Sequence, residues 1–366
     1  MKQTKQGRLL IPDTQKGEST MKKKSSAMAL LVGAALMLSA CSEGNAEAGK
    51  TEVDDVIKVV WYPNESGSDM TSSRDEIGAA IEQATGKKVE HQLTTDYAIA
   101  IETLVNNNAD LAFMGAQGYI EAKNGNDAIE PLVVPTGESG TLDDAIYHSW
   151  LAVNVDAQEE FQVDGEFSLD TLEQKKMSFV SNSSTSGFVV PSSTIISHFA
   201  EQSGYEDLTA EDLMEGGPLF SQVLFGNSHQ GSAVNLLNDS AEVAAFCDTC
   251  VENYVEVTEG EANEVGSIYK VKDDAAEPFN TVTGSEFALM GVTPVLNAPF
   301  VANMEVLGQE DYDALQELFT SDEIANNEKI FVPEDSGESG LFFKSADERF
   351  APVEDAWFDP IRELSK

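Results

Sequence analysis

Residues 56–122 alternate between short β-branched runs and amphipathic segments, and this alternation limits the possible folds more than any other feature of the chain. The run "VIKVVWYP" (56–63) ends at a proline, which is typical of a buried strand. In "SSRDEIGAAIEQATG" the apolar residues share one helical face, with Ser73 and Glu76 as a capping box and Gly86 as the helix end. Two further strand–helix units follow. We therefore predict an α/β fold with a mainly parallel sheet flanked by helices, which binds ligands at the carboxyl ends of its strands.

The same pattern restarts after residue 150, which predicts a second lobe inserted into the first. A later strand-like stretch, "EFALMGVTPVLNAPFVANMEV", returns the chain to the first lobe. We expect lobe I to comprise residues 55–149 plus 288–366, and lobe II to comprise residues 150–287. Two lobes joined by two crossing segments form a hinged clamp with a cleft between them.

Residues 21–40 have the pattern of an export signal. Met21 and three lysines precede an apolar stretch that is short for a membrane span, and "LSAC" follows. This pattern resembles a bacterial lipoprotein signal, in which Cys41 becomes the lipidated first residue. An ordinary secretory signal with an incidental cysteine is the alternative. We expect residues 1–20 to be an extra extension, residues 41–54 a flexible tether, and the protein to be anchored by lipid at the outer face of the cytoplasmic membrane.

The chain is strongly acidic, with a formal net charge of −42. Residues 1–40 carry seven Lys or Arg and two Asp or Glu, so the rest of the chain is more negative still. A surface of this charge repels nucleic acid and anionic membrane faces, which excludes nucleic-acid-binding functions. Adaptation to salt or alkali explains such a surface without reference to the ligand.

The stretch "SNSSTSGFVVPSS" (181–193) places seven hydroxyl side chains around one glycine, between a predicted strand and a helix that starts near Pro191. Hydroxyls and the free N–H groups of a helix start can bind an anion without Lys or Arg. A helix cap beside a solvated loop is the alternative. A second turn of this kind, "GNSHQGS" (226–232), carries His229, and together the two turns predict one anion site in the second lobe.

Cys247 and Cys250 occur in "FCDTC", and three states of this pair are possible. In an exported protein the pair predicts a small disulfide loop, and two free thiols or a metal or redox site are the alternatives. No second CxxC and no paired histidines complete a zinc site in the sequence.

The sequence lacks the familiar enzyme and nucleotide motifs: G-x-S-x-G, H-E-x-x-H, a Walker loop and a glycine-rich dinucleotide fingerprint. We therefore expect no catalytic activity, no cofactor and no metal. A hydrolase that uses a serine with His229 is an alternative that the sequence leaves open.

Several segments resemble one family in their order and spacing. "TTDYAIAIETLVNNNADLAFMGAQGYIEA", "YHSWLAV", "NSSTSGFVVP" and "GNSH" are similar to the phosphonate-binding PhnD-like proteins, the substrate-binding subunits of ABC importers for phosphonate, phosphite or phosphate. The resemblance runs from about Val56 to Pro299. It implies a two-lobe periplasmic-binding-protein fold of type II, a small phosphorus oxyanion as ligand and an ABC permease as partner. We also expect the protein to be a monomer.

The resemblance also implies the ligand-binding residues. Ser184, Thr185, Ser186 and His229 would hold the oxygens on phosphorus from the second lobe, while Tyr97, Tyr147 and, less closely matched, Tyr62 would donate phenol hydroxyls. Asp248 occupies the region where some family members place an acid for an ammonium group, although it lies between two cysteines that the family does not require. A sensor subunit that signals to a membrane kinase is the alternative to a transport function.

Overall fold

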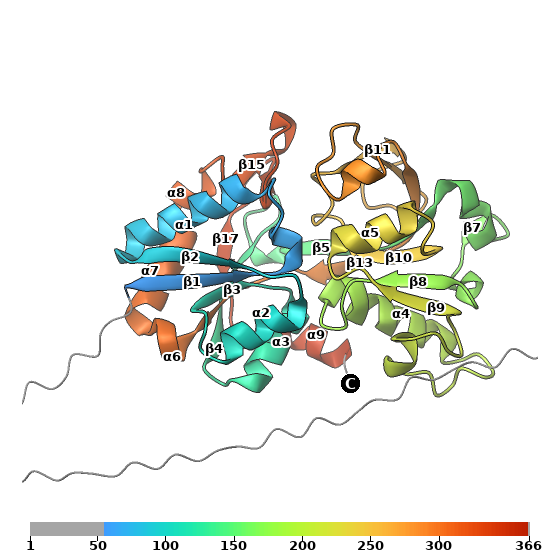
Figure 1. The fold of residues 1–366 in the computed structure, drawn as a ribbon, viewed down its shortest axis with the longest axis horizontal. Coiled ribbons are helices and arrows are strands. Elements are labelled where there is room, and N and C mark those ends of the chain that lie inside the picture. The colour runs from blue at the N-terminus through green and yellow to red at the C-terminus, as the bar shows by residue number, and fades with distance from the viewer. Residues whose placement is uncertain (1–54, 365–366) are drawn as a thin grey trace, which may run out of the picture. The chain divides into compact units, whose positions relative to one another are not determined.

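The strands of this protein form two large sheets, shown in a computed structural model that describes residues 55–364 (Figure 1). All described residues belong to one unit by their contacts. In Figure 1, the blue elements share one half of the described structure with the red-orange elements near the C-terminus, and the green, yellow and light-orange elements form the other. The predicted N-terminal extension, signal peptide, Cys41 lipidation site and tether lie outside the described residues.

The first sheet combines strands from the beginning and the end of the described chain. In spatial order it contains β17 (Phe350–Pro352), β4 (Ile129–Pro135), β14 (Phe300–Asn303), β3 (Leu111–Phe113), β1 (Val56–Trp61) and β2 (Lys88–Leu93). β1 pairs in parallel with β2 and β3. β14 is antiparallel to both of its neighbours, β3 and β4, and β17 is antiparallel to β4.

The second sheet contains the strands of the middle of the chain. In spatial order these are β11 (Val255–Glu259), β12 (Ile268–Val271), β13 (Glu286–Leu296), β5 (Ile146–Asn154), β10 (Val243–Cys247), β8 (Lys176–Phe179) and β9 (Gln222–Phe225). β8 is parallel to both β9 and β10, whereas the other neighbouring pairs are antiparallel. Short pairs are formed by β6 (Gln162–Val163) with β7 (Glu166–Phe167) and by β15 (Phe331–Pro333) with β16 (Phe342–Lys344).

The prediction of two lobes, each a sheet flanked by helices, is confirmed, but the prediction that the sheets are mainly parallel is wrong. Both sheets are mixed. Parallel neighbours need a long crossover connection, usually a helix, and β1, β2 and β3 are joined in that way. β5 and β13 pair directly with one another, and β13 leads into β14 after three residues, so these strands run against their neighbours.

Helices cover both faces of each sheet. α1 (Thr71–Thr85), α7 (Gln309–Phe319) and α8 (Asp322–Ala325) pack on one face of the first sheet, and α2 (Tyr97–Val105), α3 (Ala116–Gly125) and α9 (Asp359–Leu364) pack on the other. The short α6 (Met304–Leu307) follows β14. α4 (Val190–Phe199) and α5 (His229–Leu237) cover opposite faces of the second sheet.

Burial on both faces explains why the second half of β1 is apolar. Val59, Val60 and Trp61 are consecutive and fully buried, as expected of a strand with helices on both sides. Gly86 ends α1 in the left-handed conformation with φ of 69°, as predicted. The predicted capping box is wrong, because α1 begins two residues earlier, at Thr71, and Ser73 is buried within its first turn.

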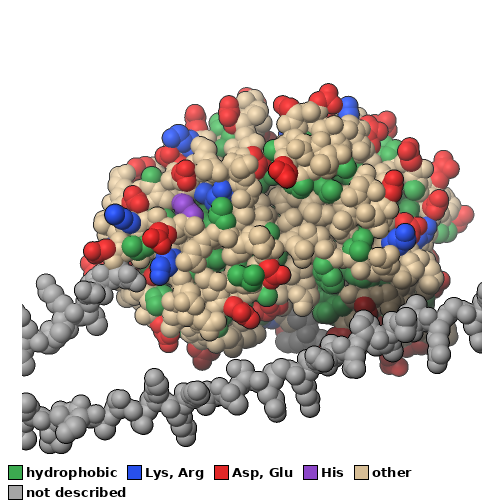
Figure 2. Space-filling view, in the orientation of Figure 1, with side chains coloured by type: hydrophobic (Ala, Val, Ile, Leu, Met, Phe, Trp, Pro, Cys, Tyr) green, Lys and Arg blue, Asp and Glu red, His purple; other side chains and the backbone are tan. Residues whose placement is uncertain are grey.

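Asp and Glu side chains are far more frequent than Lys and Arg on the face drawn in Figure 2. Within residues 55–364, no helix has the length and the apolar character needed to cross a membrane.

Candidate functional site

One cavity of about 640 Å³ collects residues from elements of both sheets. The residues predicted to contact ligand all line it: Tyr62, Tyr97, Tyr147, Ser184, Thr185, Ser186, His229 and Asp248. Among the described residues that line the cavity there is no Lys or Arg. Whatever attracts a ligand to this cavity must therefore be neutral donors, helix starts or acidic groups.

The hydroxyl loop forms the start of a helical segment after β8. Ser184 caps a π-helix, Thr185–Val189, that continues directly into α4, and its Oγ accepts a hydrogen bond from the N–H of Gly187 at 3.1 Å. Gly187 is required here because a Cβ would collide with Val180. Single π-turns within helices are frequent at functional sites. Ser184, Thr185 and Ser186 are all buried.

Thr185 also meets the start of α3, which belongs to the first sheet. Its Oγ1 accepts a hydrogen bond from the N–H of Gln117 at 2.9 Å. A Cβ at Gly115, the N-cap of α3, would lie 2.9 Å from the same oxygen, so glycine allows this close approach. With α4 and α5, α3 is the third helix whose N-terminal end reaches the cavity, and helix N-termini favour negative charge.

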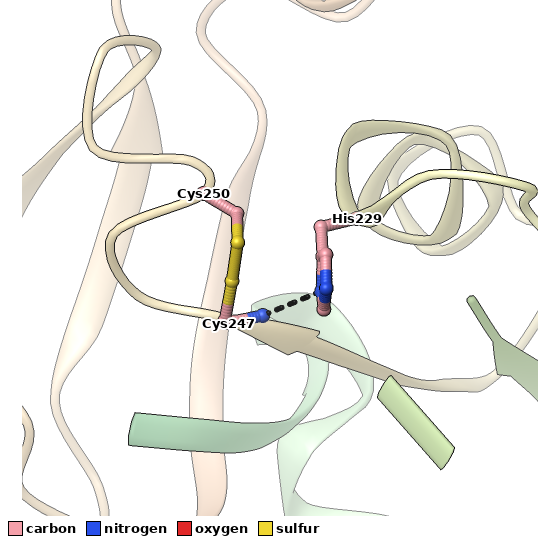
Figure 3. A group of neighbouring side chains, drawn as sticks. All are labelled: His229, Cys247 and Cys250. Carbon is pink, nitrogen blue, oxygen red and sulfur yellow. Dashed lines mark hydrogen bonds between the residues drawn. A yellow bond between two sulfur atoms is a disulfide. The ribbon is translucent and has the colours of Figure 1, made fainter. Parts of the chain in front are cut away.

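His229 begins α5, and its imidazole has a defined tautomer. Ser228 caps the helix by accepting a hydrogen bond from the N–H of Gly231 at 2.9 Å. His229 Nδ1 accepts a hydrogen bond from the N–H of Cys247 at 3.0 Å (Figure 3). Burial lowers the pKa of His229 to about 3, so the ring is neutral. We assign its single proton to Nε2, which lies 3.4 Å from Ser184 Oγ.

Three phenols complete the donor set. Tyr62 and Tyr97 have ring centroids 4.0 Å apart, and Asn64 Nδ2 donates to Tyr97 Oη at 2.6 Å. The Tyr147 phenol lies within electrostatic reach of Thr185 and Ser186. Burial raises the pKa of all three phenols, so each keeps its O–H proton at neutral pH.

Four of the groups that can donate to a ligand share one hydrogen-bonding arrangement. The hydroxyls of Ser184, Thr185 and Tyr97, and Nδ1 of His229, each accept a hydrogen bond from an N–H group. A hydroxyl or a neutral imidazole that accepts in this way keeps its own proton for another acceptor. Tyr62 Oη and Ser186 Oγ are also buried, and within residues 55–364 neither atom has a hydrogen-bond partner. The arrangement suits a compact ligand with several acceptor oxygens.

Asp248 lies on the cavity wall with its carboxylate already engaged. Oδ1 accepts from the N–H groups of His148 and Thr249, at 2.9 and 2.7 Å, and Oδ2 lies 2.8 Å from His148 Nδ1. His148 also lines the cavity and was not predicted from the sequence.

The other acids on the cavity wall were not predicted from the sequence, and two of them, Glu65 and Glu252, have a raised pKa. Burial raises the pKa of Glu65 to about 8 and that of Glu252 to about 7, so each is largely protonated below its pKa and becomes anionic above it. Glu65 lies close enough to Tyr62, Tyr97 and Tyr147 for its charge to act on all three phenols. As the pH rises, ionisation of these acids makes the cavity less favourable for an anion.

Asn64 and Gln230, also missed, join the two halves of the cavity. Asn64 Oδ1 accepts from the N–H of His229 at 3.0 Å, and the Asn64 carbonyl accepts from Gln230 Nε2 at 3.1 Å. Asn64 follows β1, so its position at the carboxyl end of a parallel strand was a usable signal. Gln230 had no comparable signal.

Cys247 and Cys250 are joined by a disulfide next to His229 (Figure 3). Cys247 is fully buried at the end of β10. The two sulfurs and one His229 nitrogen lie within 4.8 Å of one another, a spacing that could suit a metal ion. A metal binds thiolates rather than disulfide sulfurs, so in the oxidised form this group does not offer a zinc ligand set.

Comparisons with known proteins give a consistent result. Residues 59–358 match the family described as "ABC transporter, phosphonate, periplasmic substrate-binding protein". The chain is 28% identical over 337 residues to the phosphate-import protein PhnD of Mycolicibacterium smegmatis, covering 90% of this chain and 92% of that protein.

Solved structures share the fold. A binding protein component of an ABC phosphonate transporter from Pseudomonas aeruginosa has a TM-score of 0.60 and 19% identity, covering 84% of this chain and 85% of that one. PhnD1 from Prochlorococcus marinus in complex with methylphosphonate has a TM-score of 0.57 and 17% identity, covering 85% of this chain and 97% of that one. This chain belongs to the family of periplasmic substrate-binding proteins of phosphonate ABC transporters.

Proposed function

We propose that the protein captures a phosphonate, or a related oxyanion such as phosphite or phosphate, in this cavity and delivers it to an ABC permease. The observation that carries the proposal is the shared arrangement of the donors. Ser184, Thr185, Tyr97 and His229 each accept an N–H and so retain a proton for the ligand. A phosphonate offers three oxygens on one centre, which a convergent set of neutral donors and helix starts can satisfy without a cationic side chain.

Delivery would follow from hinge closure. We propose that residues 55–149 plus 288–366 move as one lobe and residues 150–287 as the other, about the crossing strands β5 and β13. A ligand held by donors from both sides favours the closed state, which the permease would recognise. The hydrogen bonds from the His229 N–H to Asn64 and from the Gln117 N–H to Thr185 would form on closure.

The donor geometry supports a binding role without a chemical step. In a Ser–His hydrolase, Nε2 must be unprotonated to take the serine proton. Here Nδ1 accepts from Cys247, so Nε2 already carries a proton and cannot take one from Ser184. The pair is therefore arranged to hold an oxyanion rather than to activate a nucleophile.

Calorimetric titration of the purified protein with phosphate, phosphite, methylphosphonate and 2-aminoethylphosphonate tests the proposal, with sulfate as a control anion. We expect saturable binding of at least one phosphorus oxyanion and weaker binding of sulfate. Failure of all four to bind would overturn the proposal. Ligand-dependent stimulation of ATP hydrolysis by the reconstituted permease separates transport from the sensor alternative.

We also propose that Cys41 is lipidated and holds a monomeric protein at the outer face of the cytoplasmic membrane. Mass spectrometry of the protein extracted from its own membranes would show the acylated Cys41. A Cys41→Ala variant should leave the membrane fraction, and its retention there would contradict the anchor. Sedimentation of that variant tests the monomer.

A further inference from the structure

The turn closed by the Cys247–Cys250 disulfide supports the start of α5 at two points. The N–H of Cys247 donates to His229 Nδ1 at 3.0 Å, and the Cys250 carbonyl accepts from Gln230 Nε2 at 3.0 Å. His229 and Gln230 are the first two residues of α5, and both are buried. The turn therefore contacts the start of α5, which faces the cavity, and lines the same cavity with Asp248, Thr249 and Cys250. Figure 3 shows its bond to His229.

The bond from Cys247 determines what His229 can offer to an anion. A neutral imidazole has one N–H, and an N–H donated to Nδ1 requires that proton to be on Nε2. If the Cys247 N–H moved away, the proton could occupy Nδ1 instead. Nε2 would then present a lone pair toward Ser184 and the cavity, where it would repel an oxyanion that it otherwise binds.

Gln230 links the disulfide turn to Asn64, on the opposite side of the cavity. Its Nε2 donates both to the Cys250 carbonyl and to the Asn64 carbonyl, at 3.0 and 3.1 Å. Asn64 in turn accepts from the N–H of His229 at 3.0 Å. The position of the turn is therefore linked to the loop after β1 as well as to the imidazole.

We propose that the Cys247–Cys250 disulfide is a positioning element that sets the tautomer of His229 and the place of Gln230, so that ligand affinity depends on the oxidation state of this pair. The disulfide keeps the two ends of the turn together. Two thiols need more room than one disulfide, and Cys247 is fully buried, so reduction must displace an end of the turn. Each end carries one of the two hydrogen bonds to α5.

The expected change in ligand affinity rests on the proposed function, whereas the expected change in the His229 tautomer does not.

In the reduction step, a dithiol thiolate attacks the partly buried Cys250 sulfur and Cys247 leaves as a thiolate that takes a proton. The second thiol of the reagent then releases Cys250 and closes a cyclic disulfide. Two electrons and two protons pass from the dithiol to the pair.

The test uses the full chain with Cys41→Ala, so that Cys247 and Cys250 are its only thiols. Methylphosphonate affinity is measured by calorimetry before and after reduction with dithiothreitol, with alkylation and mass spectrometry to count free thiols. We expect Kd to rise about 10- to 100-fold on reduction, the factor for one charge-assisted hydrogen bond. A Cys247→Ser/Cys250→Ser variant should match the reduced protein.

Nitrogen NMR of the histidine rings gives a readout that does not need ligand. In the oxidised protein His229 should show a protonated Nε2 and an unprotonated Nδ1, and reduction should change this pattern. In a His229→Gln background, reduction should alter Kd much less than in the parent. The turn closes only four residues, so we expect little change in Tm.

The outcomes separate the two proposals. An unchanged His229 tautomer and an unchanged Kd in the fully reduced protein would overturn the positioning role. If both the reduced protein and the serine variant lose their far-UV circular dichroism, the disulfide is a general staple and the local role is also overturned. If the oxidised protein binds no phosphorus oxyanion but the tautomer still responds to reduction, only the proposed function fails.

Discussion

Replacing Asn64 by alanine should weaken ligand binding while leaving the ligand-free fold nearly as stable. Asn64 is buried, and its side chain makes two hydrogen bonds in the cavity wall. Its Nδ2 donates to Tyr97 Oη and its Oδ1 accepts from the N–H of His229. The first bond directs the Tyr97 proton toward the cavity, and the second joins the loop after β1 to the start of α5.

The expected loss of binding free energy follows from these two hydrogen bonds. Asn64→Ala leaves the buried N–H of His229 without an acceptor, which costs about 1–3 kcal/mol, and removes one ordinary bond to Tyr97, worth about 0.5–1.5 kcal/mol. The sum of about 1.5–4.5 kcal/mol corresponds to roughly 10- to 2,000-fold in Kd. If the two sides meet only on closure, this cost falls on the ligand-bound state.

Calorimetry with methylphosphonate and thermal unfolding without ligand measure the two effects separately. Asn327→Ala is a matched control, because the Asn327 amide donates to Glu76 at 2.9 Å, away from the cavity. We expect Kd to change by less than about twofold in the control, as for most surface substitutions. An Asn64→Ala protein with parental Kd, or one whose affinity loss is matched by Asn327→Ala, would refute the reasoning.

Three further predictions concern the cavity. Ser184→Ala with Thr185→Ala should weaken binding by about 3–6 kcal/mol, because two charge-assisted bonds are lost, and unchanged calorimetric affinity would mean that the loop only caps a helix. Asp248→Asn should reduce affinity for 2-aminoethylphosphonate far more than for methylphosphonate, and equal losses would remove the proposed contact with an amine. Burial raises the pKa of Glu65 to about 8, so rising pH adds a negative charge there and opposes an anion. Methylphosphonate affinity should therefore fall more between pH 7 and 9 in the parent than in Glu65→Gln, and parallel pH profiles would contradict this role.

Local patterns in the sequence were sufficient to predict the units that carry the site. The alternation that begins at residue 56 identified the parallel strands β1, β2 and β3. The hydroxyl cluster identified a loop before a helix, although the helix was predicted to start near Pro191 and the helical segment begins directly after Ser184. These features are readable because strand and helix periods, caps and turns depend on residues close in sequence.

The remaining features of the fold and the site depend on contacts between residues that are far apart in the sequence. Asn64 meets His229 from 165 positions away, and no local pattern marks that pairing. β14 is antiparallel to its neighbours because of the direction in which β13 returns the chain from the second sheet. Hydrophobic periodicity does not predict the direction of a strand. The Cys247–Cys250 spacing was compatible with a disulfide, two thiols or a metal site, and its link to His229 required the fold.

The lack of Lys and Arg around the cavity affects how fast an anion arrives. Most anion sites attract their ligand over long range with positive charge, but this chain carries a net charge of −42 and repels an approaching anion. Neutral donors act only at contact, so tight binding must come from slow release rather than from rapid capture. Salt screens the repulsion beyond about 10 Å at 0.1 M and leaves the short donor contacts almost unaffected. A saline medium therefore speeds the arrival of the ligand at this site, whereas it slows arrival at a site built on lysine and arginine.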